Sequence, residues 1–395
     1  MNLQTQQQLL ARAQALKAAG STDMAPHALR IAAAHYTDAA LLQEELQQHF
    51  RLRPLLLALT PDIPAPGSFL ARDVIGWPLL LVRGDDGVAR TFVNACRHRG
   101  ARVAGGRGQA RSFSCPFHAW NYGSGGHLIA RSNSHGGFDA MCAADSNLQA
   151  LPTRERGGMI FVQLGGEDID AGLAVLIGPA VDEIASYDIG AQVYFDTRQI
   201  VRDCNYKLVV DTFTEAYHIA ALHKDSIRPF YFSSPALTDA LGAVTRMIGV
   251  RSSIEKEWLK PAAEQRLLRH GTTQYILPPN TVLTHQIDHI QLWQVFPVAG
   301  DPGRCEVNFH LYWPRSSASD AAELGEEDKR KAAFNVDVIW KVTNEEDFPQ
   351  CEHAHAALAS GALPAVVFGR NEPGGVYYHQ QMDAVMAQPA TQLVE

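Results

Sequence analysis

The chain has 395 residues, 46% of them hydrophobic, so it can form two or more packed cores and is not expected to be disordered. Its formal net charge of −8 argues against a nucleic-acid-binding surface, because such surfaces are net basic. No apolar run approaches the roughly 20 residues of a membrane helix, and residues 1–20 lack the compact apolar block of a signal peptide, so we expect a cytoplasmic protein that binds no membrane.

In chain order, residues 1–20 predict an amphipathic surface helix, and residues 25–60 also carry apolar side chains at helical spacing. From residue 61 the composition changes to turn formers and short apolar runs. Two such runs flank Gly84–Gly87, which is typical of a β-hairpin. Glycine-rich sequence with short strand-like runs continues to about residue 166. We therefore predict a small all-β domain over residues 55–166.

The remainder of the chain predicts an α+β domain, assembled from residues 1–54 together with 167–395. Three segments rich in β-branched and aromatic residues predict an antiparallel sheet: Thr281–His285, Ile290–Val298 and Glu306–Trp313. A long helix is expected over residues 326–344, and a further helix from Pro349 to a glycine stop at Gly361. Helices segregated around an antiparallel sheet define the α+β class.

Two short motifs within the all-β segment carry potential metal ligands. They are C-x-H at Cys96 and His98, and C-x-x-H at Cys115 and His118. Two cysteines and two histidines can bind tetrahedral zinc or a Rieske [2Fe–2S] cluster. In a C2H2 zinc finger both cysteines precede both histidines, whereas here the two residue types alternate, so each loop can offer one ligand to each iron. This order favours the cluster over zinc, and over two buried cysteines with two surface histidines.

A second motif, E-x-x-H-x4-H, comprises Glu215, His218 and His223. Residues five apart on a regular helix lie about 140° apart, so the two histidines converge only if the helix bulges or ends between them. Taken alone, the pattern is more typical of an ordinary helix with two histidines on its polar face. Its position after the Cys–His loops changes this interpretation.

Together the motifs resemble those of Rieske-type non-haem iron ring-hydroxylating oxygenases. The segments Asn94–Gly100 and Cys115–Trp120 are similar to the two cluster loops of this family, and Asn205–His223 is similar to the mononuclear-iron motif of its catalytic (alpha) subunits. The resemblance implies a helix-grip (START-like) catalytic domain, in which an antiparallel sheet wraps a long C-terminal helix.

The resemblance also implies ligands for two cofactors. The [2Fe–2S] Rieske cluster would be bound by Cys96, His98, Cys115 and His118. Mononuclear Fe(II) would be bound by His218, His223 and one carboxylate near the start of the last long helix, where the family has a Glu-Asp pair. Asp347 is the expected ligand there, and Glu346 is the alternative. Two histidines and one carboxylate leave coordination positions open for O2.

Glu215 has a different implied role. In the family, a carboxylate at this position hydrogen-bonds between an iron-ligating histidine and a cluster histidine of the neighbouring subunit in a head-to-tail trimer. Here it would connect His218 to His118 of another copy, with Asp211 supporting the same network. The simpler interpretation of Glu215 and His218 is an ordinary i, i+3 pair on a helix.

The implied function is that of a terminal oxygenase component. It would use O2, and electrons from NAD(P)H through a separate reductase or ferredoxin, to hydroxylate or dihydroxylate an aromatic or other apolar ring compound in aromatic hydrocarbon catabolism. One alternative is a monooxygenase that demethylates a cationic amine or cleaves its C–N bond, because Glu at position 215 occurs in such branches. Another is a Rieske electron carrier without oxygenase activity. The implied assembly is a homotrimer, with or without a beta subunit.

Overall fold

The computed structural model describes residues 1–132, 134–166, 168–315 and 324–387. Internal contacts divide the chain into two compact units. One unit is Phe50–Gly172, and the other combines Met1–His49 with the described residues from Leu173 onward. The assignment of domains to 55–166 and to 1–54 with 167–395 stays a prediction, and residues 133, 167, 316–323 and 388–395 of these ranges lie outside the described residues.

The smaller unit consists of three antiparallel sheets. A five-stranded sheet has the order β10-β5-β4-β3-β6, and two three-stranded sheets have the orders β11-β12-β2 and β7-β8-β9. The strands are β2 (Leu55–Leu59), β3 (Ser68–Val74), β4 (Trp77–Arg83), β5 (Ala89–Val93), β6 (Arg107–Gln109), β7 (Ser112–Ser114), β8 (Trp120–Gly123), β9 (Leu128–Arg131), β10 (Ala150–Leu151), β11 (Thr153–Arg156) and β12 (Met159–Val162). A 3₁₀ turn (Thr60–Asp62) and helix α4 (Ala143–Ser146) complete it.

The predicted hairpin is confirmed as β4 and β5. The amide of Gly84 donates to the carbonyl of Val88 at 2.9 Å, and Asp86 Oδ1 accepts from the Val88 amide at 3.1 Å. Gly87 has φ +78°, a left-handed conformation that glycine adopts without strain. The turn therefore fixes the register between β4 and β5, and the loop that carries Cys96 follows directly after β5.

The larger unit is built on a seven-stranded antiparallel sheet with the order β13-β19-β18-β17-β16-β15-β14. Its strands are β13 (Gln192–Arg202), β14 (Tyr231–Leu241), β15 (Val244–Arg251), β16 (Gly271–Leu277), β17 (Thr281–His285), β18 (Ile290–Pro297) and β19 (Cys305–Pro314). A separate pair joins β1 (Leu29–Ala32) to β20 (Ala365–Phe368). The three strands expected from sequence are β17, β18 and β19, which are adjacent in the sheet.

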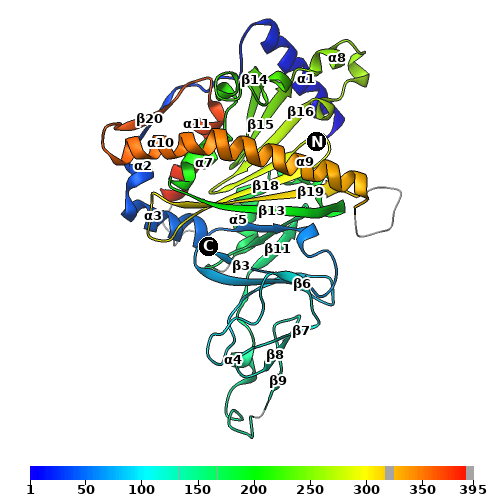
Figure 1. Ribbon diagram of the computed structural model, residues 1–395, viewed down its shortest axis with the longest axis vertical. Coiled ribbons are helices and arrows are strands. Elements are labelled where there is room, and N and C mark those ends of the chain that lie inside the picture. The colour runs from blue at the N-terminus through cyan, green and yellow to red at the C-terminus, as the bar shows by residue number, and fades with distance from the viewer. Residues whose placement is uncertain (133, 167, 316–323, 388–395) are drawn as a thin grey trace. The chain divides into compact units, whose positions relative to one another are not determined.

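Helices lie around this sheet (Figure 1). They are α1 (Leu3–Ala18), α2 (Ala34–Thr37), α3 (Ala39–Glu45), α6 (Val181–Ala185), α7 (Tyr206–Thr212), α8 (Ile254–Trp258), α9 (Glu326–Val342), α10 (Phe348–Ala359) and α11 (Pro373–Met386). Helix α5 (Ile169–Ile177) contains the point in the chain where the smaller unit ends and the larger one resumes. The 3₁₀ turns are Ile189–Ala191, Tyr217–Ala220, Arg228–Phe230, Ala262–Glu264 and Leu267–Arg269, and π-helical turns span Leu46–Arg51 and Thr343–Asp347.

The long helix α9 crosses the sheet and contacts β13 and β19 (Figure 1). Its Trp340 ring stacks on Trp293 of β18 and on Phe309 of β19, with ring centroids 6.4 and 6.3 Å apart. Trp293 and Phe309 are almost fully buried, and their own centroids are 4.4 Å apart. Burial of these aromatic rings is what attaches the helix to the sheet, since each ring removes a large apolar area from water.

One expectation about the elements is wrong. Residues 25–60 are not one helical stretch, because Leu29–Ala32 and Leu55–Leu59 form strands. All five residues of Leu55–Leu59 are buried, and a short, continuously apolar run does not distinguish a buried strand from a buried helix by periodicity. The helical spacing came from the intervening α3 and the π-helical turn that follows it.

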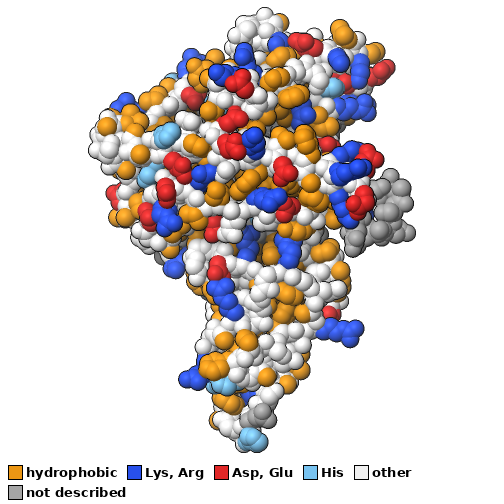
Figure 2. Space-filling model, in the orientation of Figure 1, with side chains coloured by type: hydrophobic (Ala, Val, Ile, Leu, Met, Phe, Trp, Pro, Cys, Tyr) orange, Lys and Arg blue, Asp and Glu red, His pale blue; other side chains and the backbone are white. Residues whose placement is uncertain are grey.

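Among the described residues, no helix has the length and apolar character needed to cross a membrane. The face drawn in Figure 2 has acidic and basic side chains interspersed over the larger unit. That face therefore carries a mixed charge pattern.

Candidate functional site

The two Cys–His loops of the smaller unit have matching backbone geometry. In each loop the cysteine carbonyl accepts from the amide four residues later, Gly100 in the first and Ala119 in the second, at 2.8 and 2.9 Å. Both of these residues have positive φ, +79° and +54°. The cysteine amides are also bonded, that of Cys96 to the carbonyl of Ala101 and that of Cys115 to the carbonyl of Trp120, both at 2.8 Å.

These loops bring the four predicted ligands together. Cys96 and Cys115 are both 3% exposed and belong to one core cluster. The Nδ1 atoms of His98 and His118 lie 3.1 Å apart. The His98 ring stacks on Trp120 at a centroid distance of 5.2 Å, which fixes its orientation.

This donor set fits a Rieske cluster. Two imidazole nitrogens bound to one ion at roughly 2.1 Å each are separated by about 3–3.5 Å, and the Nδ1 atoms of His98 and His118 already have this separation. The Tyr122 hydroxyl lies 3.2 Å from Cys96 Sγ and accepts from the Arg97 amide at 3.0 Å. Hydrogen bonds to the sulfur atoms around a cluster are one of the factors that set the reduction potential of the cluster.

In the larger unit, the E-x-x-H-x4-H segment is not a continuous helix, contrary to the i, i+3 helix pair considered for Glu215. Helix α7 begins at the N-cap Asn205, whose side chain accepts from the Lys207 amide, and it ends at Thr212. After four intervening residues, a 3₁₀ turn covers Tyr217–Ala220. The α-helix therefore ends before the first histidine, and the 3₁₀ turn that contains His218 ends before His223, so no continuous helix joins the two histidines.

Glu215 organises the turn between these helices. Its Oε2 accepts the backbone amides of Tyr217 and His218, the latter at 3.1 Å. Its Oε1 is hydrogen-bonded to Nδ1 of His218. With Nδ1 committed to this carboxylate, Nε2 of His218 is the ring nitrogen left to face Asp347.

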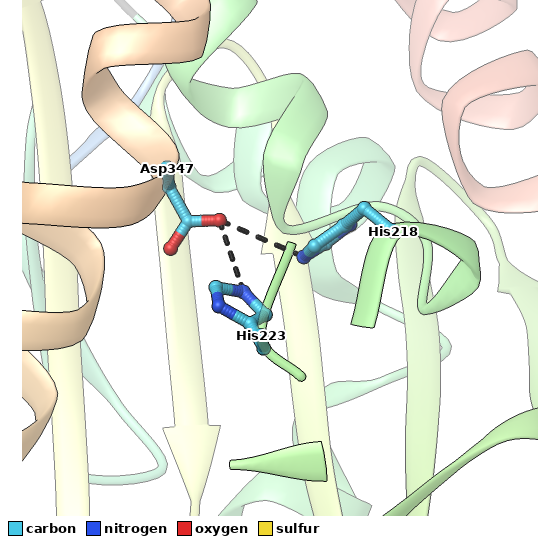
Figure 3. A group of neighbouring side chains, drawn as sticks. All are labelled: His218, His223 and Asp347. Carbon is cyan, nitrogen blue, oxygen red and sulfur yellow. Dashed lines mark ion pairs between the residues drawn. The ribbon is translucent and has the colours of Figure 1, made fainter. Parts of the chain in front are cut away.

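The third predicted ligand comes from the end of α9. The π-helical turn Thr343–Asp347 follows Val342, and Phe348 donates its amide to the carbonyl of Thr343, five residues back. Asp347 Oδ1 lies 3.6 Å from Nε2 of His218 and 3.2 Å from Nε2 of His223, so the carboxylate points between the two rings (Figure 3).

Glu346 lies beside this group but faces the other side of His223. Its Oε2 is 2.7 Å from Nδ1 of His223 and accepts from the Ser226 hydroxyl at 2.8 Å. Burial alone lowers the pKa of His223, but hydrogen bonds and charge from Asp347 and Glu346 outweigh burial and raise it. Each histidine therefore has one carboxylate on Nδ1 and shares Asp347 on Nε2.

His218, His223 and Asp347 offer ligand atoms that all lie within 4.8 Å of one another. Two imidazoles and one carboxylate with a common open side fit a divalent iron site of the facial-triad kind. The carboxylate–histidine pairs fit it as well, because metal-ligating histidines usually donate their second nitrogen to a carboxylate or carbonyl.

Asp211 is not part of this network. Its Oδ2 accepts from the Tyr36 hydroxyl at 3.0 Å, and its Oδ1 is 2.8 Å from Nε2 of His379. The expected link from Asp211 to Glu215 is replaced by a buried contact that ties α7 to α2 and α11. Burial, followed by the charge of Asp211, raises the pKa of Tyr36 well above its usual value.

A cavity of about 350 Å³ opens onto the His218, His223 and Asp347 group. Its walls near the histidines are apolar and aromatic, and include Phe213, Ile219 and Trp293. This volume is at the lower end of the range for small-molecule sites. A small substrate placed here would lie next to the open side of the three ligands.

Two family models match the chain. The Rieske [2Fe-2S] domain model matches residues 54–137, and the ring hydroxylating alpha subunit (catalytic domain) model matches residues 185–388, more than half of the chain. The chain belongs to the ring-hydroxylating alpha-subunit family. Its cofactors are those of that family, a Rieske [2Fe–2S] cluster and a mononuclear non-haem iron.

Curated relatives of this ring-hydroxylating alpha subunit include three enzymes. It is 31% identical over 194 residues to the glycine betaine monooxygenase oxygenase subunit of Chromohalobacter salexigens, covering 48% of this chain and 42% of that one. It is 30% identical to the Escherichia coli K12 carnitine monooxygenase oxygenase subunit, covering 49% of this chain and 52% of that one. It is 27% identical to the biphenyl 2,3-dioxygenase subunit alpha of Rhodococcus jostii, covering 63% of this chain and 52% of that one. The matches span about half the length of these relatives.

Solved structures confirm the fold of the ring-hydroxylating alpha subunit. The quaternary ammonium Rieske monooxygenase CntA matches with a TM-score of 0.74 at 20% identity, covering 93% of this chain and 97% of that one. Naphthalene 1,2-dioxygenase from Rhodococcus sp. matches with a TM-score of 0.74 at 17% identity, covering 97% and 99%. The predicted class, a Rieske domain plus an α+β catalytic domain, is therefore confirmed.

Several site residues were not identified from sequence. The contact of Glu346 with His223 and Ser226 joins segments more than a hundred residues apart, and no local pattern signals it. Tyr36 and His379 likewise reach Asp211 from opposite ends of the chain. The Glu-Asp pair at 346–347 did carry a usable signal, since both carboxylates contact the iron-motif histidines.

Proposed function

We propose that this protein is the terminal oxygenase component of a Rieske system that oxidises a small organic substrate with O2. Electrons would come from NAD(P)H through a separate reductase, ferredoxin or both, and reach the cluster at Cys96, His98, Cys115 and His118. The observation that carries the proposal is the cavity that opens onto His218, His223 and Asp347. Iron bound there would supply open coordination positions for O2 beside the substrate.

The residues of the chain would have distinct tasks in this reaction. Asp347 would bind the metal through Oδ1, with Nε2 of His218 and of His223. Glu215 and Glu346 would hold the two rings by Nδ1. The apolar wall would exclude water from the reacting carbon. Glu215 would also be the carboxylate through which an electron passes from His118 of a neighbouring subunit.

Two substrate classes have support. Curated relatives at about 30% identity are glycine betaine and carnitine monooxygenases, which favours attack on a quaternary amine. Phe213, Phe230 and Trp293 line the cavity, and aromatic faces can bind such a cation. The same rings suit an aromatic substrate, and one curated relative is a biphenyl dioxygenase. Aromatic hydrocarbon catabolism is therefore the second candidate.

We also propose a homotrimer, with or without a beta subunit, in the cytoplasm. The support for the trimer is the Glu215 carboxylate, which already holds His218 and keeps lone pairs for a further donor.

Metal and sulfide analysis of anaerobically purified protein tests the proposed function. We expect roughly three irons and two sulfides per chain, with a Rieske EPR signal after reduction. Asp347→Ala should lose one iron and all substrate-dependent O2 uptake, and should keep the EPR signal. Asp337→Ala, on the exposed side of α9, is the matched control and should keep all irons. Full O2 uptake by Asp347→Ala would refute the assignment, and zinc in place of iron would refute the function.

A further inference from the structure

One end of the cavity is polar and lies on the sheet. It is formed by Tyr231 of β14, Arg251 of β15, Thr272 of β16 and Gln286, which directly follows β17. Arg251 is opposite Tyr231 in the register of the two strands, and its guanidinium carbon is 5.1 Å from the centroid of the Tyr231 ring. A flat guanidinium stacked in this way has a defined orientation.

At this end of the cavity the side-chain oxygen of Gln286 is already an acceptor for two hydrogen bonds, whereas N–H donors of Gln286 and Arg251 remain for a ligand. Gln286 Oε1 accepts from Arg251 Nη2 at 2.9 Å and from the Thr272 hydroxyl at 2.8 Å. The amide of Gln286 must present its oxygen to Arg251, because a guanidinium only donates. Its NH2 group is then a donor. Thr272 Oγ1 is also 2.7 Å from the Tyr231 hydroxyl.

The charge of Arg251 is not neutralised within the described part of the chain, where its side chain has the neutral Gln286 as partner and no carboxylate within 4.0 Å. Its Nε is buried and has no hydrogen-bond partner among the described residues. Arg246, on the same strand, has a buried Nε of the same kind, but its charge is balanced by ion pairs with Glu183 and Asp239, both at 2.7 Å. A partly buried guanidinium with spare donors is an anion-binding group.

Neighbouring titratable groups do not supply that anion. Asp288 is bonded to Nδ1 of His289 at 2.7 Å, and this hydrogen bond, with a contribution from the charge of Arg251, lowers the pKa of Asp288. The other ring nitrogen of His289 lies 2.8 Å from the side-chain nitrogen of Gln291, so both ring nitrogens of His289 already have partners. The carboxylates that line the cavity, Glu215 and Asp347, are at the metal end.

We propose that the substrate carries a carboxylate, which Arg251 binds with help from the Gln286 amide. With the acid held at this end, the remainder of a small molecule extends along the apolar wall toward His218, His223 and Asp347. The inference adds a substrate class to the proposed oxygenase function. Only the oxidation of the bound molecule rests on that function, since binding of the carboxylate by Arg251 does not require turnover. This inference narrows both proposed substrate classes to molecules with an acid group: an aromatic acid in place of a plain hydrocarbon, which would leave Arg251 desolvated, or a quaternary amine that also carries a carboxylate, since Arg251 would repel a simple cation.

Ligand binding to the anaerobic holoenzyme, measured by calorimetry without an electron donor, tests the proposal. Benzoate is compared with its neutral isostere benzamide, and an aliphatic trimethylammonio carboxylate with tetramethylammonium. We expect each acid to bind on the order of 10- to 100-fold more tightly than its partner without the carboxylate. The tighter of the two acids then distinguishes an aromatic from a quaternary-amine source. Equal binding of acid and acid-free partner in both pairs would overturn the proposal.

Two variants at Arg251 separate its charge from its shape. Arg251→Gln should abolish the preference for acids, and Arg251→Lys should keep part of it, since an ammonium retains the charge but not the planar fork. Arg228→Gln removes a positive charge from an exposed residue outside the cavity lining and should keep the preference. Equal weakening of benzoate and benzamide by Arg251→Gln would contradict the proposal. Since no turnover is needed, failure of the oxygenase function would be recognised separately, by metal content and O2 uptake.

Discussion

Both histidines of the predicted iron site are held by carboxylates on Nδ1, but the two carboxylates come from different places. Glu215 is three residues from its histidine, whereas Glu346 reaches His223 from the end of the long helix. Carboxylates in this position fix the tautomer and the ring plane of a ligand and raise its basicity. They are therefore expected to affect metal affinity without binding the metal.

Glu346→Gln tests this at the level of one side chain. The amide keeps the length and shape of the side chain but loses the negative charge that faces Nδ1 of His223. We expect metal affinity or turnover to fall about 10- to 100-fold, with the Rieske EPR signal unchanged. Titration of the apoprotein with Fe(II) measures it. An affinity as low as that of Asp347→Ala would instead identify Glu346 as a ligand.

At this scale the family resemblance, and not the motif spacing alone, implied which residues converge, but it did not identify their hydrogen-bond partners. His218, His223 and Asp347 meet as the family resemblance implied. The role expected of Asp211 was wrong, because contacts to Tyr36 and His379 depend on how distant helices pack. A sequence read one segment at a time contains no information about such packing.

At the scale of elements, the turn that carries Glu215 packs against the start of α11. A methyl group added at Gly374 would overlap the carbonyl oxygen of Thr214. The close approach of the two backbones therefore requires glycine here. No local sequence pattern signals this contact or the break in the helix after Thr212.

Gly374→Ala should shift the turn and lower the mononuclear iron content. Overpacking of this kind costs about 1–3 kcal/mol, so the melting temperature should also fall. The cluster, in the other unit, should keep its EPR signal. Gly325→Ala, where an added methyl meets no atom of the described residues within 4 Å, is the control and should keep full iron occupancy. Normal iron content in both variants would mean that the turn does not position His218.

Strand β17 ends in a histidine whose ionisation opposes folding. His285 stacks on Tyr187 with ring centroids 4.1 Å apart, and its Nδ1 is buried with no hydrogen-bond partner among the described residues. Burial, with the charge of the N-terminal ammonium group, lowers its pKa to about 4. Since the unfolded histidine titrates near pH 6.5, the unfolded state binds more protons between these values, and stability falls as the pH drops through this window.

His285→Gln should remove this part of the pH dependence. Between pH 7.5 and 5.0 the wild-type protein should lose about 2 kcal/mol more unfolding free energy than the variant. Urea unfolding at the two pH values measures the difference. An identical pH dependence in both proteins would show that His285 is protonated within the fold.

At the scale of the whole molecule, the sequence predicted two kinds of architecture and their cofactors. The alternation of Cys and His, the hairpin at Gly84–Gly87 and the three adjacent strands could be predicted because each is a local pattern, whereas the mononuclear iron followed only from the family resemblance. The helical stretch predicted over residues 25–60 was wrong, since pairing of Leu29–Ala32 with Ala365–Phe368 joins opposite ends of the chain.

The proposed trimer makes a prediction about mixed assemblies. His118→Ala should lack the cluster and Asp347→Ala the mononuclear iron, so each should be inactive alone. If electrons cross between subunits, co-expression of the two variants should restore part of the O2 uptake, in assemblies whose trimeric mass is verified by light scattering. Inactive mixed trimers would place electron transfer within one subunit.

The π-helical turn at Thr343–Asp347 makes the proposed metal site sensitive to the number of residues in the chain as well as to their identity. A π turn accommodates one more residue than the α-helical turn it replaces, so α9 and α10 are out of phase by that residue. Deleting a single residue there would restore an ordinary helix and rotate Asp347 by about 100° from the histidines. All three ligand residues would still be present in the sequence, but their side chains could no longer converge on one metal ion. A family alignment that ignores gaps would therefore wrongly score the metal site of such a protein as complete.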